Sequence, residues 1–345
     1  MRSVALADAD LDALARGGGG VDVARSLVRA RRGATLLLTA AAVRADPRAE
    51  PALRALARLP RAAVDRVLDD PATGAWAAAT ARGAAPATDL AFAAAAAAIR
   101  AGVPVELSFP QAGSGFLPSL GPLVEPVSGP CRTDRLRWTP APVVPVDGHA
   151  LAVSPLPAHL FPPDLPQATP GDHSALIREA WRTMADALPG TAAEFAAMIT
   201  TLVPLSAPDG HATSSTVTDA LGAVFLTFNT DAEALAATLV HELHHAKLAV
   251  VMDIHALTKP SATRYHAPWR PDPRPAGALL HGVYAFLGVA GFWRRRPGSE
   301  RARAEFDRWR TATLAAAGDL LAGDDLTARG RRFVTTAAGV LRGWG

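Results

Sequence analysis

The sequence predicts an α+β protein that is mostly α-helical, with a small β-sheet. The chain has 345 residues, of which 49% are hydrophobic and 19% are charged, a balance typical of a folded protein. Apolar residues recur at helical spacing through the alanine-rich first hundred residues and again through most of the second half. Short, loosely alternating apolar runs bounded by Pro and Gly lie between these regions and indicate strands.

Three helices are predicted in the first hundred residues. Val21–Arg32 follows a run of four glycines and has apolar residues at helical spacing. Ala52–Leu68 has the same pattern, and Pro60 is expected to kink or split that helix. Asp89–Ile99 is apolar nearly all round, which indicates a buried helix, and Thr88 is a plausible N-cap.

The character of the chain changes near Gly102. Strands are predicted at Val103–Phe109, Arg135–Thr139 and Val143–Val153, since each run alternates loosely and Pro- and Gly-rich turns separate them.

A Pro-rich connector, Ser154–Pro170, indicates a domain boundary. We therefore expect two parts. Residues 1–160 would form a helical N-terminal region with short strands and a candidate peptide-binding role, and residues 161–345 would form the metal-binding catalytic part.

The second half is predicted to be mainly helical, with one short strand at Ala223–Phe228. Asp231 or Thr230 supplies an N-cap for a helix that runs to about Leu257, before Pro260. The other predicted helices are His173–Leu188, Thr191–Leu202, Ala278–Arg295, Ser299–Leu321 and Leu326–Leu341.

Composition excludes several classes of function. The net charge of +3 is too small to argue for nucleic-acid binding, and the lone Cys131 excludes an intramolecular disulfide and any multi-Cys metal site. The first 20 residues lack the apolar run of a secretory signal. The apolar stretch Ala278–Trp293 is too short for a membrane span and contains His281. We therefore expect a cytoplasmic protein without nucleic-acid or membrane partners.

The sharpest motif is HExxH, formed by His241, Glu242 and His245 in the middle of a predicted helix. Residues four apart share one helix face, with Cβ atoms about 5–6 Å apart, so two imidazoles at this spacing can bind one metal ion. At about 100° per residue, His244 points about 80° away from the direction that His241 and His245 share. We therefore expect His244 not to be a ligand.

A third protein ligand is needed, and the known zinc-peptidase patterns do not supply one. Leu248 and Val251 occupy the positions where the metzincin pattern requires Gly and His. The thermolysin-like pattern requires a Glu on the next helix, but there is none between Glu242 and Glu300.

The best candidate for the third ligand is His281, which lies 36 residues after His245 on the next predicted helix. The HExxH helix would then pack against this second histidine-bearing helix, and Gly282 would permit their close approach. A satisfied core histidine is the alternative reading of His281. Asp253 and Asp272 remain possible carboxylate ligands, and His255 and His266 are weaker alternatives.

The loop from Arg264 to Pro275 is stiff, because a proline recurs at every third residue or closer over its second half. Its Arg270 and Arg274 have forked guanidinium donors suited to carboxylates. The alternative is a structural role, in which Arg270 pairs with Asp272 or stacks on Trp269.

Together, three segments resemble the HExxH-motif peptide-modification family, and the resemblance covers about Phe228–Trp293. They are the HExxH motif, the Tyr265-x-x-Pro268-Trp269-Arg270-x-Asp272-Pro273-Arg274-Pro275 loop and the Leu280-His281-Gly282-x-Tyr284-Ala285-Phe286 helix. Proteins of this family are associated with radical-SAM maturases of ribosomally made peptides. Members are recognised as iron oxygenases that use α-ketoglutarate (2-oxoglutarate) to hydroxylate Cβ of peptide residues, in natural-product (RiPP) biosynthesis.

The resemblance implies that His241, His245 and His281 hold Fe(II). It also implies that Arg270 or Arg274 binds the distal carboxylate of α-ketoglutarate and that Tyr265 is a further residue of the co-substrate site. It implies a ribosomal precursor peptide as substrate and a radical-SAM maturase as a candidate partner. Three histidines depart from the usual set of two His and one carboxylate. Glu242 is about 100° round the helix from His241, so we expect it behind the ligands or as a proton acceptor.

Two other functions remain open. In a zinc metallopeptidase, Glu242 would act as general base on a zinc-bound water, whose pKa falls to about 7. In a non-catalytic peptide-binding protein, the HExxH motif would be structural and the Arg-bearing faces of the N-terminal half would bind an acidic peptide.

Overall fold

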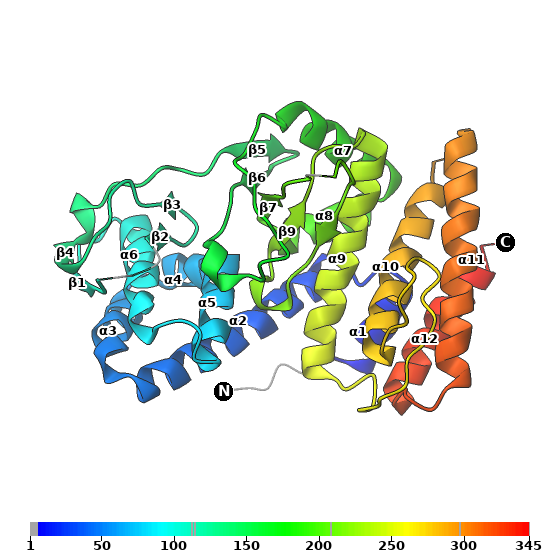
Figure 1. The fold of residues 1–345 in the computed structure, drawn as a ribbon, viewed down its shortest axis with the longest axis horizontal. Helices are drawn as coiled ribbons and strands as arrows, with labels where there is room; N and C mark the ends of the chain where they lie inside the picture. Colours follow the sequence, from blue (N-terminus) through cyan, green and yellow to red (C-terminus); the bar gives the residue numbers. More distant parts are fainter. Residues whose placement is uncertain (1–5, 112, 114, 208, 297, 345) are drawn as a thin grey trace. The chain divides into compact units, whose positions relative to one another are not determined.

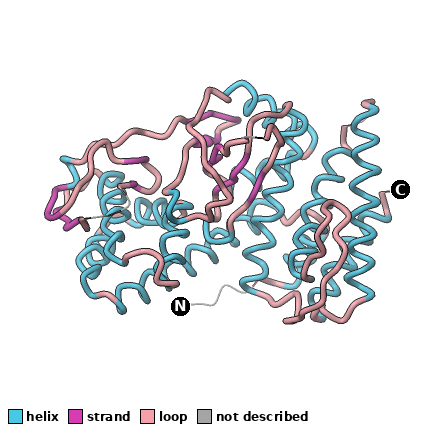
Figure 2. The backbone as a smooth tube through the Cα atoms, in the orientation of Figure 1, coloured by secondary structure: helices cyan, strands magenta, loops and turns pink. Residues whose placement is uncertain are grey.

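A computed structural model describes residues 6–111, 113, 115–207, 209–296 and 298–344. Over this part of the chain, 58% of the structure is helical and 12% is strand, with twelve α-helices. The predicted fold class, a mostly helical α+β protein, is therefore confirmed. Figure 2 shows the strands as short magenta pieces among helices and long loops.

The chain divides into two compact units that interleave along the sequence. Unit 1 comprises Met1–Leu27, His173–Ile199 and Thr230–Gly345, and unit 2 comprises Val28–Asp172 and Thr200–Asn229. The two parts expected from the sequence, in contrast, follow one another along the chain.

Unit 1 is built from helices. Helix α9 contacts α7, α8 and α10, and α10 contacts α11 and α12. Figure 1 shows α9, α10 and α11 side by side. The HExxH helix thus packs against the second histidine-bearing helix, as predicted. The helices are α1 (Asp8–Ala15), α7 (Ser174–Ala187), α8 (Pro189–Met198), α9 (Ala232–Ile254), α10 (Ala276–Arg294), α11 (Glu300–Ala322) and α12 (Ala328–Arg342).

Helix α10 is the one described helix that is long and apolar enough to cross a membrane, by length and composition alone. However, 78% of its most apolar 18-residue stretch is buried inside the protein, where the helix packs against α9, α11 and α12. This burial is the pattern of a core helix.

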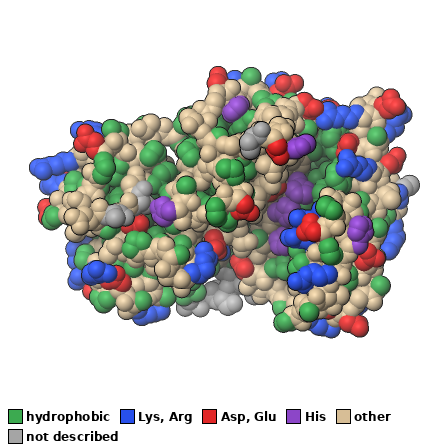
Figure 3. All heavy atoms as spheres, viewed as in Figure 1, with side chains coloured by type: hydrophobic (Ala, Val, Ile, Leu, Met, Phe, Trp, Pro, Cys, Tyr) green, Lys and Arg blue, Asp and Glu red, His purple; other side chains and the backbone are tan. Residues whose placement is uncertain are grey.

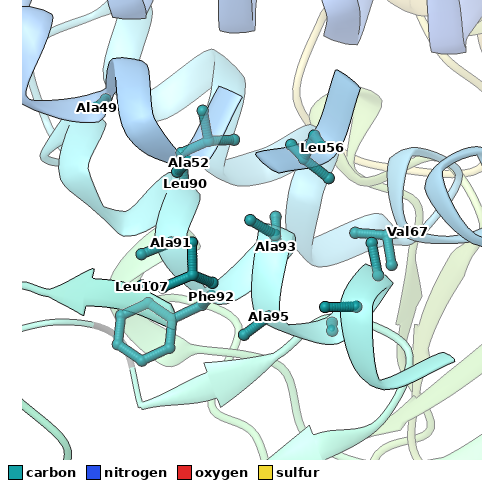
Figure 4. Close-up of a cluster of buried hydrophobic side chains, with 14 of the residues drawn as sticks. Ala49, Ala52, Leu56, Val67, Leu90, Ala91, Phe92, Ala93, Ala95 and Leu107 are labelled. Carbon is teal, nitrogen blue, oxygen red and sulfur yellow. The ribbon is translucent and has the colours of Figure 1, made fainter. Parts of the chain in front are cut away.

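Unit 2 has a helical layer whose core is built around α6. Alanines 94–98 of α6 are 0% exposed, and their small side chains let neighbouring backbones approach closely. In Figure 4, Ala52 and Leu56 of α3 lie close to Leu90 and Ala93 of α6. Helix α2 (Gly20–Ala45) begins in unit 1, and the others are α3 (Glu50–Arg58), α4 (Arg61–Leu68), α5 (Pro71–Ala81) and α6 (Leu90–Ala101).

Unit 2 also contains a mixed five-stranded sheet in the order β5-β6-β7-β9-β8. Strands β5 (Val143–Val146) and β6 (His149–Val153) form a hairpin, and the turn residues Asp147 and Gly148 both have positive φ. Strands β7 (Thr201–Pro204) and β9 (Ala223–Leu226) are parallel and fully buried, and β8 is Ser214–Ser215. Two small antiparallel sheets pair β1 (Glu106–Phe109) with β4 (Gly129–Arg132) and β2 (Phe116–Leu117) with β3 (Gly121–Pro122).

Several local predictions need correction. Arg135–Thr139 is not a strand but a turn and loop that makes only an isolated bridge from Trp138 to Leu123. The helix predicted to reach Leu202 ends at Met198, because Thr201 starts β7. Thr88 is not the N-cap of α6, since Asp89 occupies that position.

Candidate functional site

Helix α9 holds the HExxH motif in its interior. Asp231 caps its N-terminus, because its side chain accepts a hydrogen bond from the Ala234 amide at 2.9 Å. The motif lies well inside the helix, whose regular geometry sets the directions of the histidine side chains.

The three histidines that the sequence predicts as metal ligands lie together. Nε2 of His241 is 2.9 Å from Nε2 of His245, and Nδ1 of His245 is 3.3 Å from Nδ1 of His281 on α10. All three side chains are partly exposed. On the face shown in Figure 3, His side chains gather in the region of α9 and α10, beside Arg and acidic side chains.

This arrangement fits half of a metal site. Two nitrogens 2.9 Å apart can each lie about 2.1 Å from one ion with an angle of about 90° between them, the value for neighbouring ligands in an octahedron. His281 instead faces the opposite nitrogen of the His245 ring. Among the described residues, no group of three or more His, Cys, Asp or Glu side chains converges as a metal site. A three-histidine site therefore requires a ring of His245 or His281 to rotate.

The electrostatics favour neutral imidazoles. Burial lowers the pKa of His245 to about 4, and burial together with His245 lowers the pKa of His281 to about 4. Burial, followed by the neighbouring His245, also holds the pKa of His241 well below its usual range. A neutral imidazole is the form that ligates a metal, so the protonation state of the cluster at neutral pH is compatible with metal binding.

His244 points away from the cluster, as predicted. Its Nδ1 lies 2.8 Å from the Val240 carbonyl oxygen and its Nε2 lies 3.3 Å from the Gly17 carbonyl oxygen. A Cβ on Gly288 would lie 2.5 Å from the His244 ring, so this glycine, rather than Gly282, lets α9 and α10 approach closely. Glu242 is also buried, at 1% exposure.

The arginines of the proline-rich loop share one carboxylate. Nε of Arg270 donates to Asp272 Oδ1 at 2.7 Å, and Nη1 of Arg274 donates to Asp272 Oδ2 at 3.2 Å. Two cations and one anion leave a surplus positive charge, and the two arginine side chains are 44% and 36% exposed. The pairing of Arg270 with Asp272, which the sequence left open as a structural role, is therefore present. Both arginines keep further N–H donors that Asp272 does not use.

The same loop is closed at its base. The backbones of Tyr265 and Arg274 exchange two hydrogen bonds of 2.8 Å, and the Tyr265 hydroxyl donates to Asp325 Oδ2 at 2.8 Å. Desolvation and this carboxylate raise the pKa of Tyr265 to about 12. Tyr265 therefore anchors the loop to the α11–α12 connection. His266 is exposed, and no contact with the histidine cluster is found for it among the described residues.

Trp269 docks this loop on α10. A Cβ on Gly282 would lie 2.1 Å from the Trp269 ring, so only glycine leaves room for the indole beside His281. Trp269 also packs on Phe286 with ring centroids 4.7 Å apart, and Phe286 packs on His241 at 4.7 Å. These contacts connect the arginine loop to the histidine cluster.

Sequence reasoning missed a buried ion pair on the other side of α9. Nζ of Lys247 donates to Glu194 Oε2 at 2.7 Å and to the Gly18 carbonyl oxygen at 3.2 Å. Oε1 of Glu194 accepts from the Gly20 amide at 2.6 Å. The two side chains are 1% and 3% exposed. The available signal was Lys247 itself, one of two lysines in an arginine-rich chain.

No protein-family model matches the chain, and no curated protein matches it significantly.

Proposed function

We propose that the chain is an Fe(II)/α-ketoglutarate-dependent oxygenase that hydroxylates Cβ of a residue in a ribosomally synthesised peptide. The observation that carries this proposal is the meeting of three neutral imidazoles from two helices, His241, His245 and His281. The resemblance of the motif residues supplies the iron and the co-substrate.

The histidines would hold the metal on one side. His241 and His245 already have the separation of two neighbouring ligands, and His281 would complete the set when one ring turns. Bound Fe(II) would supply the activation of dioxygen with α-ketoglutarate, and three ligand positions would remain open for these molecules. Phe286, packed on the His241 ring, would limit water beside the site.

The arginine loop would orient the co-substrate. Arg270 and Arg274 have more donors than Asp272 can accept from, and their surplus charge suits a second carboxylate. Tyr265 would act by holding the loop closed rather than by touching the co-substrate. Glu242, buried on α9, would lie behind the ligands or accept a proton.

The expected partners follow from the same proposal. The substrate would be a ribosomal precursor peptide, and a radical-SAM maturase would act on the same peptide. The reaction would take place in the cytoplasm, without membrane or nucleic acid.

Anaerobic reconstitution with Fe(II), followed by air, tests the proposal. Succinate should form from α-ketoglutarate in a peptide-dependent manner, and the peptide should gain one oxygen atom. His245→Ala should abolish both metal binding and turnover, whereas His266→Ala, an exposed histidine of the neighbouring loop, should retain both. Protein that binds only zinc and turns over no α-ketoglutarate would refute the proposal, and peptide cleavage that depends on Glu242 would favour the zinc peptidase.

The arginine assignment has its own measurement. Arg270→Gln or Arg274→Gln should weaken α-ketoglutarate binding by tenfold or more, measured by calorimetry on the Fe(II)-loaded protein under anaerobic conditions. Arg264→Gln in the same loop serves as the matched control. Unchanged affinity in both variants would reject the loop as the co-substrate site.

A further inference from the structure

Unit 2 contains an open cleft that none of the histidine-site residues line. Its walls come from the α4–α5 junction, the loop around Ser119, and the beginning of β7 with the end of β6. Apolar side chains such as Phe116 and Leu156 form part of the lining, and the polar lining includes Arg66, Asp70 and the Thr201 hydroxyl. An apolar cleft with a few convergent polar groups is the usual form of a small-molecule site.

Asp70 is a carboxylate without a counter-ion in contact. Its Oδ1 accepts from the Ala72 amide at 2.9 Å, and the Ser119 amide donates to the same side chain. Over the described ranges, no Lys, Arg or His nitrogen lies within ion-pair distance of it. Burial raises its pKa to about 6, since desolvation outweighs the amide donors and the charges of Arg66 and Arg100, all of which lower it. The neighbouring Asp69, in contrast, is paired with Arg32 through an Nε–Oδ1 bond of 2.7 Å.

Arg66 is the complementary group. It is exposed at the cleft, and the structure gives its guanidinium no hydrogen bond or ion pair with any described side chain. Arg100 is a second arginine near this cleft. Burial, followed by the charge of Arg66, lowers the pKa of Arg100. However, Arg100 is already engaged, because its Nε donates to Ser119 Oγ at 2.6 Å and its Nη2 to the Ser119 carbonyl oxygen. Arg66 therefore has the free donors of this cleft.

Ser119 is held in a strained conformation between these groups. Its φ of +66° lies in the left-handed region, which is uncommon for residues other than glycine. The two donors of Arg100 hold its side chain and carbonyl, while its amide donates to Asp70. Such strain persists only where the surroundings enforce it, and it is concentrated at ligand-binding positions.

We propose that this cleft binds a small α-amino acid in its zwitterionic form. Asp70 would receive the ammonium group, and Arg66 would bind the carboxylate through its forked donors. The hydroxyls of Ser154, Thr200 and Thr201 in the same wall suit a small polar side chain such as that of serine. This inference is independent of the histidine cluster and of the function proposed for it.

Binding of L-serine to the full chain in EDTA, measured by calorimetry and by saturation-transfer NMR, tests this inference. L-Serine methyl ester lacks the carboxylate and N-acetyl-L-serine lacks the ammonium group, and each should bind at least tenfold more weakly. The same results should be obtained with His245→Ala protein, so that failure here is distinct from failure of the oxygenase proposal.

Two substitutions locate the site. Asp70→Asn keeps a side-chain oxygen to cap α5 but removes the charge, and it should weaken L-serine binding at least tenfold without loss of the folded state. Arg66→Gln should do the same, whereas Arg61→Gln, an exposed arginine of the same helix, should bind as the parent protein does. No binding at 20 mM L-serine, or binding of N-acetyl-L-serine as tight as that of L-serine, would overturn the inference. Undiminished binding in Asp70→Asn would equally overturn it.

Discussion

Removing one member of the buried pair of Lys247 and Glu194 should be strongly destabilising, and the effects of the two members should be coupled. Lys247→Met removes the ammonium group and leaves the Glu194 carboxylate, only 3% exposed, with the Gly20 amide as its remaining donor. Leaving one member of a buried ion pair uncompensated costs about 3–5 kcal/mol. At about 2–4 °C per kcal/mol for a domain of this size, the expected loss in Tm is about 6–20 °C.

The matched control is the other lysine. Lys259 is exposed and its Nζ donates to the Asp324 carbonyl oxygen at 2.7 Å, so Lys259→Met should cost under about 1 kcal/mol. The double variant Lys247→Met/Glu194→Gln has no charge at this position, because both members of the ion pair are replaced. The Gln side-chain oxygen can still accept from the Gly20 amide. It should therefore recover at least about 2 kcal/mol relative to the sum of the single variants. Urea and thermal unfolding are measured on the parent protein and four variants, the single variant Glu194→Gln included. Equal losses in Lys247→Met and Lys259→Met, or strictly additive single effects, would refute this reasoning.

Two further predictions concern the histidine site. Gly282→Ala should displace Trp269 and cost about 1–3 kcal/mol in urea unfolding, because its Cβ would lie 2.1 Å from the indole. The control is Gly277→Ala, whose Cβ would have its nearest contact at 3.5 Å and which should cost less than about 1 kcal/mol. Similar losses in the two variants would contradict the role given to Gly282. The metal-free protein should lose stability on acidification. The pKa values of His245 and His281, each about 4, lie below the unfolded value of 6.5, so their contribution is complete above pH 6.5 and falls away towards pH 4. Between pH 6.5 and pH 4, the Tm measured in EDTA should fall by an amount equivalent to about a few kcal/mol. The fall should be smaller in His281→Gln. A Tm that does not depend on pH would contradict this prediction.

The histidine site shows what the sequence can predict. The motif lies in a helix with a clear N-cap at Asp231, so helical geometry alone places His241 and His245 on one face. His281 was expected beside them only because the next helix packs on α9, and the structure confirms that packing. The exact ring orientations depend on tertiary contacts such as that of Phe286 with His241, which no local pattern encodes.

Other features were hidden for physical reasons. Helix α5 was missed because its alanine-rich sequence is buried on all sides and so lacks periodicity, although Asp70 followed by Pro71 is an N-cap and first-turn signal. Arg135–Thr139 alternates like a strand, but Leu136 and Trp138 pack against the helical core of unit 2 without a neighbouring strand ladder. The partner of Lys247 is 53 residues away, beyond the reach of local spacing rules.

The identity of the basic residue at position 247 leads to a last prediction. The chain has 35 basic residues and only two are lysines, so arginine is its usual cation. At this position, however, the side chain is 1% exposed, its Nζ contacts Glu194 and Gly18, and it lies 5.6 Å from the centroid of the Tyr284 ring. A compact ammonium group suits this space, whereas a planar guanidinium needs more room and more acceptors. Lys247→Arg should therefore cost about 1–3 kcal/mol in urea unfolding although the charge is kept, while Lys259→Arg should be neutral. A Lys247→Arg protein as stable as the parent would mean that charge alone, and not shape, determines the residue at this position.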